Sequence, residues 1–262
     1  MNISQTMKKK ICWITLCRNE EEIIPFVSQY WSRIADHVVV YDNHSTDSSV
    51  ELLSKIPNVE IRYFESDGQN EFVQKAIKEN AYLEFKDKYD IIIITDMDEI
   101  FYFKDNAIFD DFLLGGYAIL ACNIYSLCES HRPKFNGSQL LHQMAHKFYK
   151  QKMNHMQGFE DYSKLSIFNC HVVDKVVMSV GQHYVNTHPV TNIMLVNNGF
   201  CMHIDKGLDE EFYVSKRKRM GENLSDINKR FGMACEYLKS EEESRKEYRE
   251  HQEKSFDLNL LL

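Results

Sequence analysis

The stretch IIIITDMDE, residues 91–99, joins a run of apolar side chains directly to three acidic ones. Residues 91–95 show no alternation of polar and apolar side chains, which is typical of a strand in a parallel sheet covered by helices on both faces. Asp96 and Asp98 follow at positions i and i+2, where two carboxylates can point the same way and share a hard divalent cation. The stretch therefore predicts a buried strand that ends in a site for Mg²⁺ or Mn²⁺, with an acidic turn in water as the alternative.

Strand and helix patterns alternate on the N-terminal side of this stretch. They predict, in order, a strand at 11–16, a helix at 20–33, a strand at 38–41, a helix capped at 45–47 and running to about 55, a strand at 59–64 and a helix at 69–85. This order favours an α/β fold with a doubly wound, mostly parallel sheet of the Rossmann type. Ligands of such sheets bind beyond the carboxyl ends of the strands.

The C-terminal side is less regular. Residues 117–125 predict another strand, and 172–180 predict a strand or a strand pair. Residues 130–162 lack a clean period and are expected to form loops and short helices. From about residue 208 the pattern becomes helical and strongly charged, which predicts a helical C-terminal segment at 208–262.

Composition and charge exclude several classes of function. The chain of 262 residues has a net charge of -8, which argues against nucleic acid as the main partner, because phosphate backbones are bound by basic surfaces. The longest apolar run is too short to cross a bilayer, and the polar N-terminus lacks the apolar region of a signal peptide. The 7 cysteines include no CxxC pair, so we expect reduced thiols in a cytoplasmic protein.

Polar loops follow three of the predicted strands, and in a parallel sheet these loops meet at one edge. The first loop contains Arg18 and Asn19, which can contact a base or a phosphate, although Arg18 can equally form a surface ion pair. Asp42 ends the second strand and can accept hydrogen bonds from a base or ribose, or else cap the following helix. The first loop contains no glycine, which argues against dinucleotide-dependent oxidoreductases and sugar nucleotidyltransferases.

Three motifs together resemble one enzyme family. TLCRNEEEII at 15–24, VVVYDNHSTDSSVELL at 38–53 and IIIITDMDEIFY at 91–102 resemble family 2-type glycosyltransferases of the GT-A fold. The bacterial branch whose first loop reads RNE and whose metal motif reads DxDE is the most similar. The resemblance covers residues 11–103 well and is looser beyond them.

The resemblance implies a metal-dependent, inverting transfer of a sugar from a nucleotide-sugar, with a UDP-hexose as the default donor. The implied acceptor is a glycan or glycolipid in the synthesis of surface polysaccharide or lipooligosaccharide. Residues 1–207 would then form the transferase domain, with a nucleotide-sugar-binding half at 1–103 and an acceptor half at 104–207. Such an enzyme is expected in the cytoplasm at the inner face of the plasma membrane.

The resemblance also assigns roles to residues. Thr15 and Asp42 match positions that hold the base and the ribose, and Asp96 and Asp98 match the DxD motif, with Asp98 as the more direct metal ligand. Polar residues near the donor are expected at Gln69, Asn70 and Asn80.

Later motifs extend the assignment to the second half. His203 is a candidate third metal ligand, with a structural histidine as the alternative. Lys164, Lys216 and Arg217 are expected to neutralise the diphosphate. The cluster at 216–219 can instead form a solvated helix face, the interpretation favoured for Lys218 and Arg219, or contact anionic lipid headgroups. The apolar residues at 258–262 would aid such peripheral membrane contact, with a frayed tail as the favoured alternative.

The catalytic base is the least defined part of the site. An acidic pair in the second half is common in this family, and Glu160 and Asp161 form such a pair, ahead of Glu129 and His131 as candidates. An exposed turn is the alternative for the pair. Because the base is uncertain, a pseudo-glycosyltransferase that binds a sugar nucleotide or glycan without turnover stays open as a second function, although the intact DxD motif argues against it.

Overall fold

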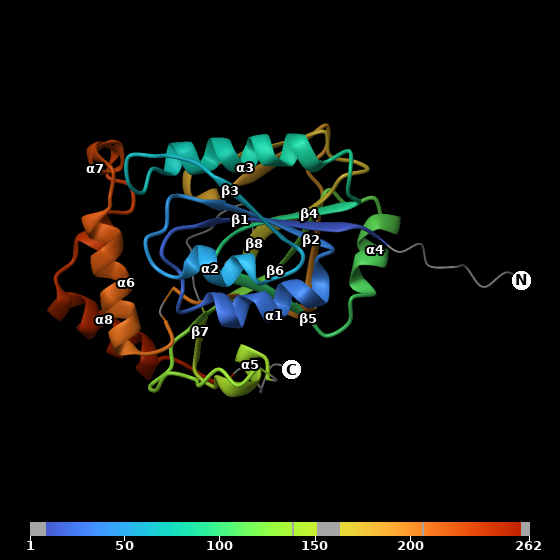
Figure 1. Ribbon diagram of the computed structural model, residues 1–262. Coiled ribbons are helices and arrows are strands. Elements are labelled where there is room, and N and C mark those ends of the chain that lie inside the picture. Colours follow the sequence, from blue (N-terminus) through green and yellow to red (C-terminus); the bar gives the residue numbers. More distant parts are fainter. Residues whose placement is uncertain (1–8, 138, 151–162, 206, 258–262) are drawn as a thin grey trace, which may run out of the picture.

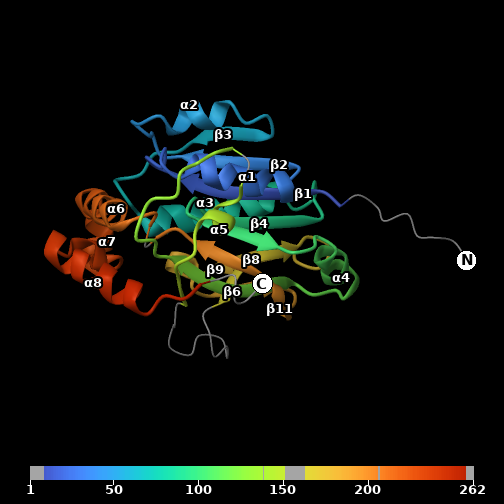
Figure 2. The ribbon, with the colours of Figure 1, turned by 90° about the horizontal axis from the view of Figure 1, so that it is seen from below.

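The computed structural model describes residues 9–137, 139–150, 163–205 and 207–257. Its centre is a nine-stranded sheet with the order β3-β2-β1-β4-β8-β6-β11-β5, and β7 pairs with β6 beside this path (Figures 1 and 2). Strands β3, β2, β1, β4, β6 and β11 run in one direction, whereas β8, β7 and β5 run against them. The predicted α/β fold with a mostly parallel sheet is confirmed.

The first half of the chain forms the parallel part of the sheet. Its elements are β1 (Ile11–Cys17), α1 (Ile24–Ile34), β2 (His37–Asp42), α2 (Ser49–Ser54), β3 (Val59–Tyr63), α3 (Glu71–Phe85) and β4 (Ile91–Asp96). All seven were predicted, with shifted ends. Helix α1 begins four residues later than expected, because Asn19 adopts a positive φ of 55° and the chain turns before Pro25 can start the helix.

Helices cover both faces of this sheet, as a doubly wound fold requires. Figure 1 shows α3 on one face and α1 and α2 on the other. Successive side chains of β1 alternate between these faces: Trp13 packs edge-on against Trp31 of α1 at 6.4 Å, whereas Ile14 joins Tyr82 of α3 in a second core. Two apolar cores therefore hold the central strands in place from both sides.

The second half inserts strands into and beyond the parallel sheet. Its elements are β5 (Glu99–Phe103), α4 (Ile108–Leu114), β6 (Ile119–Leu127), α5 (Leu141–Met144), β7 (Phe148–Lys150), β8 (Ser163–Asn169), β9 (Lys175–Met178), a 3₁₀ turn η1 (Val180–Gln182), β10 (Val185–His188) and β11 (Ile193–His203). The strand predicted at 117–125 is β6, two residues later. Strand β9 confirms the expected strand at 172–180, and its partner is β10.

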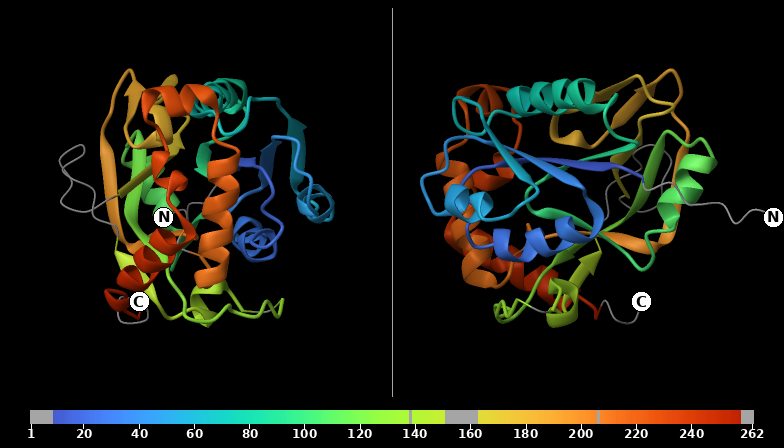
Figure 3. Two further views of the ribbon diagram at one scale, coloured as in Figure 1. Left: turned by 90° about the vertical axis from the view of Figure 1, so that its left-hand side faces the viewer. Right: turned by 45° about the vertical axis from the view of Figure 1, so that its right-hand side comes forward.

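The C-terminal segment is helical, as predicted. It contains α6 (Glu210–Glu222), α7 (Asp226–Phe231), a 3₁₀ turn η2 (Cys235–Leu238) and α8 (Glu241–Glu253). Side chains of Asp209, Ser225 and Ser240 accept hydrogen bonds at the starts of α6, α7 and α8 and so fix where these helices begin. Figure 3 shows α6 and α8 in front of one end of the sheet. None of the helices in the described part of the chain is long and apolar enough to cross a membrane.

Candidate functional site

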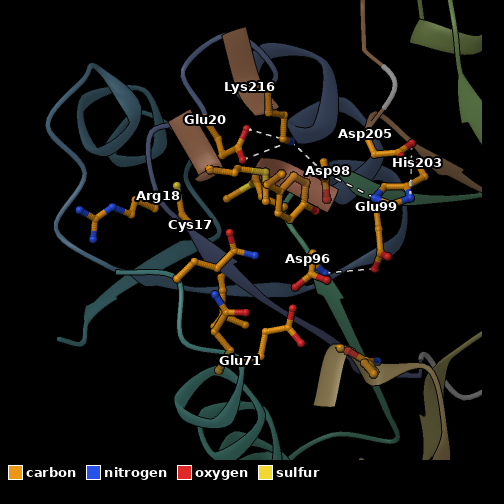
Figure 4. A pocket seen from close by; sticks show the side chains of 18 of the residues that line it. Cys17, Arg18, Glu20, Glu71, Asp96, Asp98, Glu99, His203, Asp205 and Lys216 are labelled. Carbon is orange, nitrogen blue, oxygen red and sulfur yellow. Dashed lines mark hydrogen bonds and ion pairs between the residues drawn. The ribbon is translucent and has the colours of Figure 1, made fainter. Parts of the chain in front are cut away.

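A cavity of about 550 Å³ opens at the carboxyl ends of β1 and β4, within the size range of small-molecule sites. Its walls come from the loops after these strands, the start of α3, the η1 turn and the inner face of α6 (Figure 4). The position is the one expected for ligands of a doubly wound sheet. The charged side chains at its floor are arranged as pairs.

Asp96 is paired with a lysine from α3. The ammonium of Lys78 donates to Asp96 Oδ1 at 2.7 Å and to Gln182 Oε1 at 3.0 Å. Lys78 is buried even though it is a lysine, because it lies on the same helix face as the core residues Ala81 and Tyr82. Burial raises the pKa of Asp96, but Lys78 and Lys164 outweigh that effect and hold the pKa below its ordinary value.

Asp98 is paired with a lysine from α6. Lys216 Nζ lies 2.8 Å from Asp98 Oδ2 and 3.3 Å from Glu20 Oε1, so one buried ammonium bridges two carboxylates from distant loops. Burial lowers the pKa of Lys216, but Asp98 and Glu20 outweigh it and raise the pKa. In turn, Lys216 and His203 overcome the effect of burial on Asp98 and hold its pKa well below the ordinary value.

His203 lies between two carboxylates at the end of β11. Its Nε2 is 3.5 Å from Asp98 Oδ2 and its Nδ1 is 3.5 Å from Asp205 Oδ1. Burial lowers the pKa of the imidazole, but Asp205 and Asp98 outweigh it and raise the pKa to about 9. His203 therefore lies beside Asp98 at the end of the acidic turn, and its role as a metal ligand stays a prediction.

Lys164 forms a buried ion pair with Glu99 at the turn after β4. Its ammonium lies 2.5 Å from Glu99 Oε1, and both side chains are buried. The other oxygen of Glu99 accepts a hydrogen bond from the backbone N–H of Asp96 at 3.2 Å. The Lys164 ammonium thus fixes the turn that carries Asp96 and Asp98. Lys164 also lines the cavity, and its role in neutralising a diphosphate stays a prediction.

Arg18 and Asn19 both line the cavity, and their contact with a base or phosphate stays a prediction. The Arg18 guanidinium donates to Asn43 O at 3.3 Å and to Asn223 Oδ1 at 3.5 Å, and so joins the first loop to the end of α6. The side-chain oxygen of Asn19 accepts from Thr46 N at 2.7 Å. Both partners of Arg18 are neutral groups, so no described carboxylate is paired with it.

Three predicted donor contacts lie elsewhere: Thr15, Asp42 and Asn70 are not among the described residues that line the cavity. Asp42 is buried and accepts from the backbone N–H of Ser45 at 2.9 Å and its hydroxyl at 2.5 Å. A buried carboxylate needs such partners, and the loop itself supplies them. Asn70 caps α3 by accepting from Phe72 N and Val73 N.

The other residues predicted from the sequence lie partly inside and partly outside the cavity wall. Gln69, Arg217 and Arg219 line the cavity, but Asn80 is exposed on α3. Lys216 and Arg217 are buried, whereas Lys218 is exposed and Arg219 is partly exposed, so the solvated helix face of the 216–219 cluster is formed by the latter two. The pair Glu160 and Asp161 and the apolar residues at 258–262 lie outside the described residues.

The two other candidates for the catalytic base, Glu129 and His131, do not line the cavity. Glu129 is buried, and its Oε1 accepts from the backbone N–H groups of His146 and Lys147. His131 is exposed on a loop. Neither is among the described residues that line the cavity, so both predictions as base lose their geometric support.

Several residues of the cavity were missed in the sequence. Lys78 was recognisable as a lysine on the apolar face of a predicted helix, a position that favours a buried ion pair. Glu71, Asp205 and Glu236 had no such signal, because they reach the cavity only through the packing of distant elements.

The described residues include no cluster of three or more His, Cys, Asp or Glu side chains that could hold a metal ion. Mg²⁺ is commonly bound by only one or two carboxylates together with substrate phosphates and water. Asp96 and Asp98 fit that class, since both line the cavity and nearby lysines keep both of them ionised. A divalent ion held there with a diphosphate would neutralise charge on the phosphates.

No protein-family model matches the chain, and no curated protein matches it. Among solved structures, it is similar to glucosyl-3-phosphoglycerate synthase from Mycobacterium tuberculosis in complex with Mn²⁺, UDP and glucosyl-3-phosphoglycerate, with 17% identity and a TM-score of 0.30. The complex of that enzyme with Mg²⁺ and UDP gives 17% identity and a TM-score of 0.31. Each match covers 45% of this chain and 44% of the other, so the chain matches less than half the length of these structures.

Proposed function

We propose that the chain is a glycosyltransferase that binds a nucleotide-sugar in this cavity and transfers the sugar to an acceptor hydroxyl. The observation that carries the proposal is the pair Asp96 and Asp98 at the end of the central parallel strand, each ion-paired to a buried lysine at the floor of the cavity. Such a floor combines oxygen ligands for a divalent ion with cations for a diphosphate. The RNE and DxDE motifs of the sequence support the same assignment.

Each group has a defined task in this proposal. Asp96 and Asp98 hold a Mn²⁺ or Mg²⁺ ion, which supplies charge neutralisation for the leaving nucleoside diphosphate. Lys216 lies beside Asp98 and Arg18 lines the same cavity, and in this proposal both stabilise the same negative charge. A UDP-hexose is the proposed donor, and inversion at the anomeric carbon the proposed outcome. Glu160 and Asp161 remain the proposed base for the acceptor hydroxyl.

The acceptor side of the proposal follows the family resemblance. A glycan or glycolipid at the cytoplasmic face of the plasma membrane is the proposed acceptor, in the synthesis of surface polysaccharide or lipooligosaccharide. The exposed Lys218 is the described residue of the 216–219 cluster best placed to approach anionic headgroups.

A thermal-shift screen tests the proposal directly. UDP, GDP and dTDP and one sugar conjugate of each are compared with and without Mn²⁺ on the wild type, Asp98→Asn and Asp98→Ala. A ligand at 100 times its dissociation constant stabilises a fold by about 2.7 kcal/mol, so binding is easily detected. We expect one nucleotide series to stabilise the wild type in a metal-dependent manner and to lose that dependence in both variants.

The matched control is Asp87→Ala, which removes an exposed aspartate outside the cavity lining. It should behave as the wild type. If no nucleotide stabilises the folded wild type, the proposal fails. Binding without sugar transfer or donor hydrolysis would assign the chain to the pseudo-glycosyltransferases instead.

A further inference from the structure

Glu71 lies at a different end of the cavity from the lysine-bridged carboxylates. It is the first residue of α3, and its side chain lines the cavity. Figure 4 shows Lys216 and Glu71 at opposite ends of the site, with Asp96 between them. The two ends differ, because one holds an ammonium shared by two carboxylates and the other a carboxylate with no side-chain partner among the described residues. A ligand with unlike parts therefore meets different groups at the two ends.

The Glu71 carboxylate has no hydrogen-bond or ion-pair partner among the described residues, whereas its backbone N–H donates to Asn228 Oδ1 at 3.3 Å. The two lysines of α3 that line the cavity are held by other groups: Lys75 by Glu79 at 2.9 Å and Lys78 by Asp96 at 2.7 Å. Burial, and then the nearby Asp96, raise the pKa of Glu71. A half-buried acceptor without donors is the kind of group that a ligand satisfies.

The wall beside Glu71 carries an imidazole. Gly181 has a φ of 72°, and a Cβ added there would lie 2.7 Å from His183 Nε2 and 3.5 Å from Glu71 Oε2. Gly181 thus keeps open the space that the two side chains share. Burial, and then Lys164, lower the pKa of His183, so its ring is neutral and can both donate and accept hydrogen bonds.

This wall suits hydroxyl groups better than phosphate. An unpaired carboxylate repels an anion but accepts strong hydrogen bonds from hydroxyls, and a neutral imidazole beside it adds a donor. Phosphate oxygens instead suit the opposite end, where the Lys216 ammonium lies beside Asp98, the proposed metal ligand. The division matches a molecule that is anionic at one end and polyhydroxylated at the other.

We propose that Glu71 is a sugar-binding residue that accepts hydrogen bonds from the hydroxyls of the donor sugar and so orients it in the cavity. The inference rests on the proposed function, because it assumes that a nucleotide-sugar is the ligand. It adds a specificity-determining residue, on α3, to the groups that hold the diphosphate.

The test compares a nucleoside diphosphate with its own sugar conjugate on the same variants. Binding of UDP and UDP-glucose, GDP and GDP-mannose, and dTDP and dTDP-glucose is measured by calorimetry with Mn²⁺ on the wild type, Glu71→Gln and Glu71→Ala. For the pair that binds the wild type, we expect both variants to weaken the sugar conjugate about tenfold or more, as for the loss of a hydrogen bond to a charged group. The free diphosphate should change less than about twofold.

The matched control is Glu84→Gln, on the same helix but outside the cavity lining. It should leave the affinity for both ligands unchanged. Equal weakening of diphosphate and conjugate would place Glu71 at the nucleotide and overturn the inference. Unchanged binding of both would also overturn it, and unchanged binding with a loss of kcat would reassign Glu71 to proton transfer. If no pair binds the wild type, the proposed function itself fails before any variant is compared.

Discussion

Lys216 Nζ lies 2.8 Å from Asp98 Oδ2, and this contact joins residues 118 positions apart in the chain. It ties α6 to the turn after β4, and the same ammonium reaches Glu20 in the first loop. Helix α6, the loop after β1 and the turn after β4 are therefore joined by one buried positive charge. The contact makes the stability of the C-terminal segment depend on the acidic turn of the site.

Lys216→Met should destabilise the fold. The substitution leaves Asp98 and Glu20 buried without their shared ammonium, and breaking a buried pair from one side costs about 3–5 kcal/mol. Urea unfolding measures the loss. Lys218→Met on the same helix, which removes an exposed lysine, is the control and should change stability by less than about 0.5 kcal/mol. Equal unfolding midpoints for the two variants would contradict the prediction.

The Lys164–Glu99 pair gives a second prediction on stability. Lys164→Met leaves the Glu99 carboxylate buried and unpaired, at a cost of about 3–5 kcal/mol. The double variant Lys164→Met/Glu99→Leu should recover part of that loss, because it removes the orphan charge. Recovery stays incomplete, since the N–H of Asp96 loses its acceptor, at about 1–3 kcal/mol.

Chemical denaturation of both variants at one pH decides this prediction. Lys55→Met serves as the control, because Lys55 pairs with Glu51 on the exposed face of α2 and surface pairs contribute about 0–1 kcal/mol. A single variant as stable as this control, or a double variant less stable than the single, would show that the buried pair is not arranged as described.

Protonation of His142 is expected to lower the free energy of unfolding in mild acid. Its Nδ1 is 3.0 Å from Tyr30 Oη, and burial, then Arg33, lower the pKa of the ring to about 4. The unfolded chain binds a proton near pH 6.5, before the native protein does. Stability should therefore fall as the pH drops from 6.5 towards 4, by on the order of 3 kcal/mol, and this contribution should level off below.

The pH dependence of urea unfolding in His142→Gln provides the measurement. This variant has no ring to protonate, so its stability should fall less steeply between pH 6.5 and 4 than that of the wild type. His131→Gln, on an exposed loop, should keep the wild-type slope. Identical slopes for all three proteins would exclude His142 as the source.

The parallel half of the sheet was predictable because its signals are local. The apolar run of β4 and the amphipathic pattern of α3 each lie within one element, and the order of these elements favours one sheet. Strands β8 and β11 were not foreseen. Strand β8 enters the sheet between β4 and β6 through long-range pairing, and β11 carries an irregularity between Val196 and Cys201 that breaks its alternation.

The site was predictable in position but not in its pairings. Asp96 and Asp98 follow their strand at once, so their place at the cavity is set by the local sequence. Whether Asp42 faces a ligand or its own loop depends on the path of the chain to Ser45, which a sequence pattern leaves open. The lysine partners come from other elements, so only the packed structure identifies them.

The bridge from Lys216 to the first loop also has a consequence for how the protein is made. During synthesis the ribosome releases Glu20 and Asp98 long before residue 216 leaves the exit tunnel. Until then Glu20 and Asp98 lack the ammonium of Lys216 that they share in the folded protein. A nascent chain that has formed its parallel strands but not α6 would therefore have an acidic site without the Lys216 ammonium. We expect such a chain to bind an anionic ligand only after α6 has packed against the sheet.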